Sequence, residues 1–296
     1  MDNLTHSLVG AVLGQAGLKR TTGLAVPALI IGANLPDGCR KPCSRPVELS
    51  VDEIRCAVTA FAQLGLWKVR LTGGEPSLRR DFEDVARAVA GVPGIRRVAV
   101  TTNGYRLAQR AQVWRDAGIN AINVSVDSLD PARFAAITRH DRLAEVLDGI
   151  EAAGAAGFDS VKLNAVLTRE VNDDEMAAMV DFVRARDPSL SFIEVMRTND
   201  NAAFFRDRHI AGQSVIDRLE AAGWHRLPRA PCAGSAVELG HPDAKGRIGS
   251  SRPMQEISAP VATGCGCHRT GGCICACSAM AAAICAHCFP PMIRSR

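Results

Sequence analysis

Hydrophobic residues in the middle of the chain follow two patterns that alternate along the sequence. Short runs rich in Val and Ile have the composition of β-strands. Between them, apolar residues recur at helical spacing over segments long enough to cross back over a sheet. The strand-like runs are 67–71, 97–101, 121–126, 161–167 and 191–196, and the helix-like segments are 82–92, 107–117, 143–155 and 174–184. This alternation predicts a right-handed parallel α/β architecture.

The predicted strands carry Val and Ile on both faces, which is typical of strands that are covered by helices. Periodicity alone does not separate a barrel from a doubly wound sheet. A helix is also predicted before the first strand, because Ser50 and Glu53 form a capping-box pattern. Its apolar face includes Ile54 and Val58, and Gly65 is a suitable end.

Polar residues follow all five strand-like runs, and in parallel α/β folds ligands bind at the carboxyl ends of the strands. After the first run, Gly73 and Gly74 allow close approach of a ligand, and the Glu75 carboxylate suits an ammonium group. The later polar groups are Thr101, Thr102, Asn103, Asn123, Ser125, Asp127, Lys162, Asn164, Glu194 and Arg197. Each alone has an ordinary structural explanation, but together they predict a binding site.

The order and spacing of these motifs resemble the GTP 3′,8-cyclase family, also called molybdenum cofactor biosynthesis protein A. The similar segments are 69–76, 101–104, 122–130, 161–164, 192–197, 241–243 and 246–249. Over about residues 49–249 the resemblance implies a partial (βα) TIM-like barrel that holds S-adenosylmethionine and GTP at its open face. It divides this region into a radical S-adenosylmethionine barrel core at 49–225 and a remnant of the C-terminal cyclase region at 226–249.

The resemblance also implies roles for single residues. S-adenosylmethionine contacts are implied for Gly74, Glu75, Ser125 and Met196, and GTP contacts for Arg70, Thr101 and Lys162. In that assignment Gly74 approaches the methionyl group, Ser125 the ribose and the Met196 backbone the adenine. Charge supports the GTP contacts, because a triphosphate is bound by Arg and Lys.

Enzymes of this family use 4Fe–4S clusters as cofactors, and the first cluster is held by the pattern C-x₃-C-x₂-C. Cys39 and Cys43 have the first spacing, but Pro46 stands at the third position and cannot ligate iron. The strand that should precede this loop is not evident, so we expect a barrel without its usual first strand. We therefore predict no metal ligand set in this chain.

Both ends of the chain depart from the family. Residues 1–37 resemble the amino terminus of membrane-bound metal-dependent hydrolases, in which His6 and Asp37 match candidate ligands, and we interpret 1–48 as an unrelated head. Residues 250–296 lose all hydrophobic period and hold seven of the eleven cysteines. Our hypothesis is that this irregular tail is the family's coding region read in a shifted frame. Sequencing the gene tests it.

Composition adds little to the choice of partners. A net charge of +4 and 4% aromatic residues indicate no extended nucleic-acid surface. The apolar run at 23–35 is too short to span a bilayer, and no secretory signal is evident, so we expect a cytoplasmic protein without firm membrane association. The family suggests a homodimer.

The leading functional hypothesis is therefore a lyase-type radical S-adenosylmethionine GTP 3′,8-cyclase of molybdenum cofactor biosynthesis, impaired by loss of its cluster ligands. One alternative is another radical S-adenosylmethionine enzyme, because the Gly-Gly-Glu-Pro motif is widely shared. A second is a non-enzymatic metal-binding or interaction protein that uses the Cys-rich tail. In that case Cys285 and Cys288, with Cys265, Cys267 and His268, offer zinc ligands.

Overall fold

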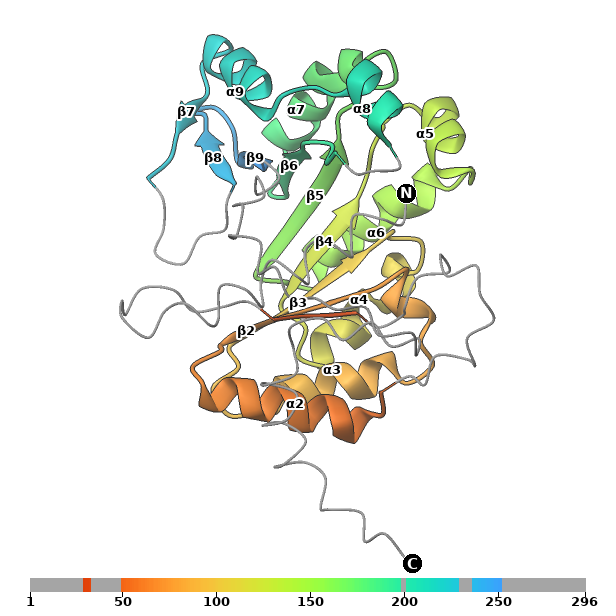
Figure 1. The fold of residues 1–296 in the computed structure, drawn as a ribbon, viewed down its shortest axis with the longest axis vertical. Helices are drawn as coiled ribbons and strands as arrows, with labels where there is room; N and C mark the ends of the chain where they lie inside the picture. The colour runs from red at the N-terminus through yellow and green to blue at the C-terminus, as the bar shows by residue number, and fades with distance from the viewer. Residues whose placement is uncertain (1–28, 33–48, 198–200, 229–235, 252–296) are drawn as a thin grey trace, which may run out of the picture.

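A computed structural model of the chain describes residues 29–32, 49–197, 201–228 and 236–251 (Figure 1). These residues form a nine-stranded sheet in the order β1-β2-β3-β4-β5-β6-β9-β8-β7. The strands are β1 (Leu29–Gly32), β2 (Lys68–Thr72), β3 (Arg97–Thr102), β4 (Ala121–Ser125), β5 (Ser160–Val166), β6 (Ser189–Ile193), β7 (His225–Arg226), β8 (Val237–Gly240) and β9 (Ile248–Ser251). The helices are α2 (Val51–Gln63), α3 (Phe82–Ala90), α4 (Leu107–Asp116), α5 (Pro131–Thr138), α6 (Leu143–Ala155), α7 (Met176–Arg184), α8 (Ala202–Arg208) and α9 (Gly212–Ala221), with short 3₁₀ turns η1 (Pro76–Leu78) and η2 (Asp173–Glu175).

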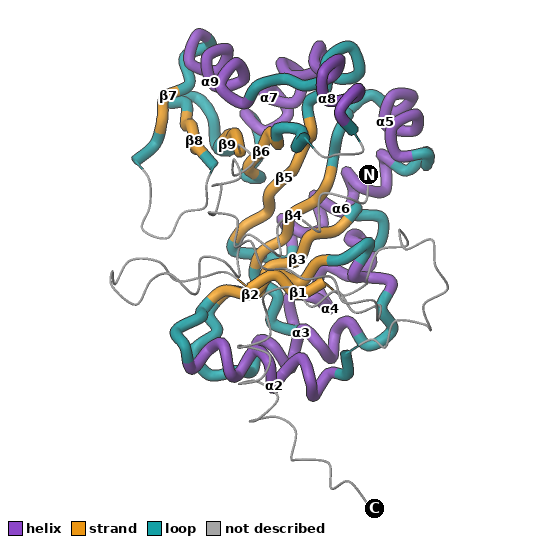
Figure 2. Tube along the Cα trace, in the orientation of Figure 1, coloured by secondary structure: helices purple, strands orange, loops and turns teal. Residues whose placement is uncertain are grey.

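The strand order identifies the barrel-type arrangement. From β1 to β6 the strands lie side by side in sequence order and run parallel, whereas a doubly wound sheet reverses its order at a switch point. Right-handed crossovers that always step in one direction place the helices on one face of the sheet. Because the sheet is curved, the helices on this one outer face appear at both ends of the view. In Figures 1 and 2, α2 and α3 lie at the bottom, and α7 and α9 lie at the top. The predicted α/β partial barrel is confirmed.

Local sequence signals define the entry into the first crossover. The Ser50 backbone N–H donates to Glu53 Oε2 at 2.8 Å, and the Glu53 N–H donates to Ser50 Oγ at 3.3 Å, so the predicted capping box is present at the start of α2. Ile54 and Val58 are buried, as the helical spacing predicted. Gly65, just beyond the helix, has a φ of 92°, a left-handed conformation that favours glycine.

The two faces of the sheet differ sharply, which corrects the expectation of apolar residues on both. The face under the helices is the core, and its side chains are at most 2% exposed; they include Val69, Leu71, Val98, Val100, Ile122, Val124, Leu163, Leu190 and Phe192. Strand side chains alternate between faces, so the intervening positions share the opposite side. That side, called the polar face below, carries Lys68, Arg70, Arg97, Thr101, Asn123 and Lys162.

The first strand is one detail in which the structure differs from the prediction. Leu29–Gly32 forms β1 and pairs in parallel with β2, so a strand from the predicted head lies at the edge that we expected to be bare. Its four residues are too few to give a clear period, which is why the sequence pattern did not indicate a strand. The barrel edge beside β2 is therefore covered by a strand of this chain.

A C-terminal hairpin completes the sheet beyond β6. β9 pairs in parallel with β6, while β8 and β7 add antiparallel strands. The turn before β9 fits closely against the end of α7: a Cβ at Gly246 would lie 2.5 Å from the Pro188 carbonyl oxygen and 2.7 Å from that of Val183. Regular structure continues to Ser251, two residues beyond the family-like segment, and the rest of the predicted tail lies outside the described residues.

We predict that Gly246→Ala lowers the free energy of unfolding by about 1–3 kcal/mol, the usual range for forcing an extra methyl group into a packed site. Backbone oxygens surround the added Cβ and cannot turn away as a side chain would. The matched control is Gly154→Ala in α6, where a Cβ meets no atom within 4 Å. That change should stabilise the helix by about 0.5–1 kcal/mol. Equal urea midpoints for the two variants would contradict the close fit of the hairpin.

Candidate functional site

The predicted GTP contacts Thr101 and Lys162 lie in one row across the polar face. Thr101 on β3 is in register with Asn123 on β4, and Asn123 is in register with Lys162 on β5. Ser125 lies two residues after Asn123, at the carboxyl end of β4, and is in register with Asn164 on β5. The structure therefore brings these predicted residues onto one face of three adjacent strands, with Ser125 and Asn164 nearer the carboxyl end, where ligands bind in such folds.

Arg70 lies on β2 and its side chain reaches this row. It is in register with Ala99 on β3, which is in register with Ala121 on β4. The two small alanine side chains leave space for the long Arg70 side chain to cross the sheet. Both guanidinium nitrogens donate to the Asn123 side-chain oxygen, at 3.0 and 3.2 Å, in the amide orientation that satisfies both groups. Arg70 is thereby fixed above the centre of the polar face.

Two further basic residues share this face, and the sequence analysis did not single them out. Lys68 is in register with Arg97, and each lies two positions before Arg70 and Ala99, respectively. The signal that could have indicated them is the period of two within the Val-rich runs, where Lys68 and Arg70 alternate with Val69 and Leu71. The polar face thus holds four basic side chains on three of four neighbouring strands.

These cations have little compensating negative charge. Within the described part of the chain, an ion pair is found for only one of the four, between Lys162 Nζ and Glu238 Oε1 at 3.7 Å. Burial, with repulsion from Arg70, Arg97 and Lys162, lowers the pKa of Lys68 to about 8. Burial also lowers the pKa of Lys162, and Glu238 opposes that shift. A crowded group of partly buried cations is typical of sites that bind an anion with several charges.

Glu75, predicted beside S-adenosylmethionine, also links the ends of β2 and β3 by hydrogen bonds. Its Oε1 accepts hydrogen bonds from Thr102 Oγ1 at 2.9 Å and the Ser77 N–H at 3.1 Å, and its Oε2 accepts one from the Asn103 N–H at 2.7 Å. Two carboxylate oxygens offer about four acceptor positions, so one remains. Next to it, Gly74 is exposed and a Cβ there would meet no atom within 4 Å. The backbone at Gly74 is open to a ligand.

Met196 lies three residues beyond β6, at the same edge of the sheet. Its carbonyl oxygen accepts a hydrogen bond from the Asn201 side-chain amide at 2.9 Å. The predicted residues therefore fall into two groups. Arg70, Thr101, Lys162 and Ser125 share the polar face, whereas the other three occupy loops that follow β2 and β6.

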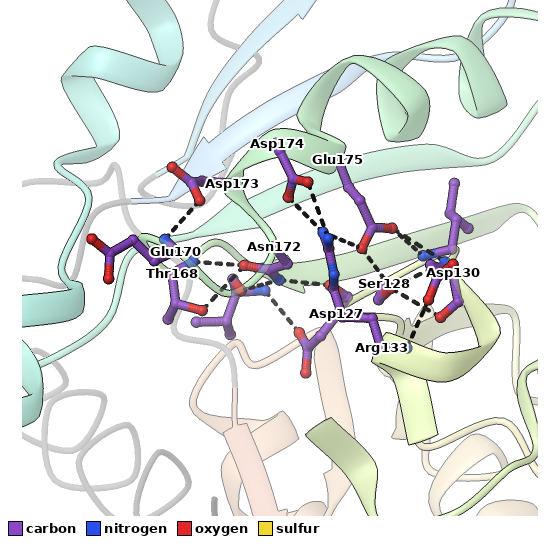
Figure 3. A network of polar contacts seen from close by, with 12 residues as sticks. Asp127, Ser128, Asp130, Arg133, Thr168, Glu170, Asn172, Asp173, Asp174 and Glu175 are labelled. Atoms are coloured by element: carbon purple, nitrogen blue, oxygen red, sulfur yellow. Dashed lines mark hydrogen bonds and ion pairs between the residues drawn. The ribbon is translucent and has the colours of Figure 1, made fainter. Parts of the chain in front are cut away.

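A network of polar contacts fixes the loops behind this edge, between β4 and α5 and between β5 and α7 (Figure 3). Asp127 accepts a hydrogen bond from the Val166 N–H at 2.8 Å, and burial raises the pKa of its carboxyl group. Asn172 donates to the Asp127 carbonyl oxygen at 2.6 Å. Glu175 accepts from the buried Ser128 hydroxyl at 2.7 Å. These contacts join the two loops, so this part of the edge is formed without a ligand.

Metal ligation was tested against the described residues. No group of three or more His, Cys, Asp or Glu side chains among them is placed to hold a metal ion. Cys39, Cys43 and Pro46 lie outside the described residues, as do His6, Asp37 and the tail cysteines. The sequence pattern C-x₃-C-x₂-P still lacks the third thiolate that a three-cysteine cluster loop requires. The residues present do not fit the cluster.

Comparisons with known proteins identify the family and the fold. The family model of the Radical SAM superfamily matches residues 35–183. The GTP 3′,8-cyclase of Stenotrophomonas maltophilia (strain K279a) is 53% identical over 219 residues, which are 74% of this chain and 67% of that enzyme. The GTP 3′,8-cyclase of Aeromonas hydrophila is 50% identical over 226 residues, 75% of this chain and 66% of that enzyme. Among solved structures, Streptococcus suis SuiB bound to S-adenosylmethionine has a TM-score of 0.51 at 17% identity, over 75% of this chain and 52% of that one, a likeness of fold.

Lys68→Met should stabilise the unliganded chain at pH 7. The folded state lowers the pKa of Lys68 from 10.5 to about 8, so it disfavours the charged form that is present at pH 7 in both states. Each pKa unit corresponds to about 1.4 kcal/mol, and partial exposure reduces the expected gain in unfolding free energy to about 1–2 kcal/mol.

The sign of the pH dependence follows from the same shift. Between pH 8 and 10.5 the native chain releases the Lys68 proton before the unfolded chain does, so the stability of the unsubstituted chain rises with pH and the gain from Lys68→Met shrinks. Urea unfolding at pH 7 and pH 9.5 measures both effects, with the exposed Lys245→Met as control. If Lys68→Met is less stable at pH 7 than the unsubstituted chain, burial and the neighbouring cations do not disfavour the charged form of Lys68.

Proposed function

The chain belongs to the GTP 3′,8-cyclase family of the radical S-adenosylmethionine superfamily, and from this premise we propose that its polar face and adjoining loops bind GTP and S-adenosylmethionine. The observation that carries the proposal is the crowding of Lys68, Arg70, Arg97 and Lys162 on one face, with a single carboxylate partner found among the described residues. A fold does not keep such charges together for its own stability, since each disfavours its neighbours.

The triphosphate of GTP fits this face by charge and geometry. Arg70 is held in place by Asn123 and presents a guanidinium fork, which can bind two phosphate oxygens at once. Lys68 on β2 and Lys162 on β5 add further positive charges for the phosphates. Thr101 offers a hydroxyl donor in the same row as Lys162. In this arrangement the protein neutralises the phosphates and orients the nucleotide, so that the ribose faces the carboxyl edge of the sheet.

The S-adenosylmethionine contacts are proposed for the edge itself. The exposed backbone at Gly74 gives the methionyl group room, and the free acceptor position of Glu75 suits its ammonium group. Ser125 is exposed at the end of β4, where its hydroxyl can donate to a ribose oxygen. The Met196 backbone would meet the adenine. All four groups lie at strand ends or in the following loops, which is where parallel barrels bind cofactors.

We further propose that this chain is impaired in the family's radical chemistry. A reduced 4Fe–4S cluster supplies that chemistry by cleaving S-adenosylmethionine, and the cluster loop of this chain has Pro46 where the third cysteine is required. The chain would then bind GTP and S-adenosylmethionine without converting them to product.

The remaining expectations concern partners and location. None of the helices in the described residues combines the length and apolar character needed to cross a membrane. The homodimer, the cytoplasmic location and the lack of nucleic-acid or membrane partners stay predictions. The identity to GTP 3′,8-cyclases favours that activity over another radical S-adenosylmethionine reaction.

Arg70→Gln and Lys162→Gln should each weaken GTP binding about tenfold to a hundredfold, the effect of losing one charge-assisted hydrogen bond. Isothermal titration of GTP at low salt measures the affinity, and Lys245→Gln removes an exposed positive charge as the control. Affinity should fall steeply as salt is added, because the binding energy is largely electrostatic. If both variants bind GTP as the unsubstituted chain does, the polar face is not the triphosphate site.

Anaerobic reconstitution with iron and sulfide tests the proposed impairment. The unsubstituted chain should retain negligible iron and cleave no S-adenosylmethionine on reduction. Pro46→Cys restores the pattern C-x₃-C-x₂-C and should raise bound iron to about four atoms per chain, with the absorption of a thiolate-ligated cluster. Ser44→Cys adds a thiol outside that spacing and is the matched control. About four irons in the unsubstituted chain would show that other cysteines complete the cluster.

A further inference from the structure

Helix α8 (Ala202–Arg208) follows the loop after β6, and none of its residues is buried. Seven residues are far fewer than an isolated helix needs to be stable in water. Helices of proteins are normally held by an apolar face packed on the core, and α8 lacks one. Contacts at its two ends must therefore hold it in place.

The first end of α8 is attached to Met196. Asn201 is the N-cap residue, but its side chain makes no capping bond to the helix. Its amide nitrogen instead donates to the Met196 carbonyl oxygen at 2.9 Å. A residue type that usually closes a helix end is used here to hold a backbone carbonyl of the preceding loop.

The second end of α8 is attached to two loops. In the loop after β5, Glu170 pairs with Arg208, and the Arg169 N–H donates to the Arg208 carbonyl oxygen at 2.9 Å. The other contact is with Glu194, two residues before Met196. His209, its C-cap residue, places Nε2 2.8 Å from Glu194 Oε1, and the side chains are 23% and 15% exposed. The Gly212 N–H donates to Glu194 Oε2 at 2.8 Å, and the Phe205 ring stacks on His209 with ring centres 4.2 Å apart. The backbone N–H of Glu194 donates to the Ser251 carbonyl oxygen at 3.2 Å, which fixes that residue to β9.

Each end of the helix thus contacts the segment 194–196, and the second end is also held by the loop after β5. We infer that Asn201, His209 and Glu194 are positioning residues of the S-adenosylmethionine site, and that α8 is a strap which holds the Met196 backbone in the orientation that meets the adenine. The inference rests on the proposed function, because it takes Met196 as an S-adenosylmethionine contact. None of the three side chains needs to touch the ligand.

The physical reason is the narrow geometry of hydrogen bonds. An adenine edge is recognised by backbone donors and acceptors, and such bonds weaken steeply when their angle or distance is wrong. Residues 194–196 lie beyond the end of β6, so hydrogen bonds between strands do not fix the Met196 carbonyl group. Losing the contact that either end makes with residues 194–196 loosens the Met196 peptide group, which reduces affinity for S-adenosylmethionine while leaving the polar face unchanged.

Three variants of the full chain separate positioning from general stability. His209→Ala removes the contact with Glu194, whereas His209→Gln keeps a side-chain donor of similar reach. His225→Ala removes an exposed histidine from β7 and is the matched control. Equilibrium dialysis measures S-adenosylmethionine affinity, titration measures GTP affinity, and hydrogen exchange followed by mass spectrometry reports on peptides covering 192–197 and 201–212.

We expect His209→Ala to weaken S-adenosylmethionine binding about tenfold, the effect of one hydrogen bond to a charged group, with GTP affinity unchanged. Exchange should rise in both peptides, and His209→Gln should recover most of the affinity and protection. If His209→Ala binds S-adenosylmethionine as tightly as the unsubstituted chain, the strap is not a positioning device. A chain that binds GTP but no S-adenosylmethionine would overturn both the proposed cofactor site and this inference, and the titration with GTP identifies that case.

Discussion

The structure depends on one electrostatic constraint: several basic side chains are crowded on one face of a parallel sheet. Lys68, Arg70, Arg97 and Lys162 lie within a few strands of each other, and Glu238 is the only carboxylate paired with any of them in the described residues. Their mutual repulsion and partial burial make the unliganded chain less stable than an apolar face would. Such an arrangement is explained by a ligand with several negative charges, and the triphosphate of the family's substrate has that character.

The rest of the fold places this face where a nucleotide can reach it. Single-direction crossovers place the crossover helices on the other side, so none of the helices described between Val51 and Arg184 covers the polar face (Figure 1). Glu75 joins the ends of β2 and β3, and the polar network of Figure 3 joins the loops after β4 and β5. The loop after β6 is held by α8 through Asn201 and His209, and α8 is in turn bonded to Arg169 and Glu170 in the loop after β5. The described parts of the loops after β2, β4, β5 and β6 are therefore held by contacts within the chain.

The sequence predicted those parts of the molecule that local pattern controls. The capping box at Ser50, the five central strands and the main crossover helices follow from side-chain period and cap chemistry, which act within a few residues. The motif positions gave the proposed ligand contacts, which lie partly on the polar face and partly in the loops at the carboxyl edge. The missing predictions concern pairing across long sequence distances. β1 is too short to show a period, Lys68 and Arg97 become neighbours only through strand register, and Glu194 meets His209 only after the chain has folded back.

The proposed role of the polar face as a cationic site for a polyphosphate can be tested through the pKa of Lys68. Nitrogen-15 NMR of the lysine side chains, with Lys68→Met to assign the resonance, gives that pKa with and without inorganic tripolyphosphate. The account predicts a pKa of about 8 in the free chain and a rise toward or above its usual 10.5 when the anion binds. A Lys68 pKa near 10.5 in the free chain, unchanged by tripolyphosphate, would contradict it.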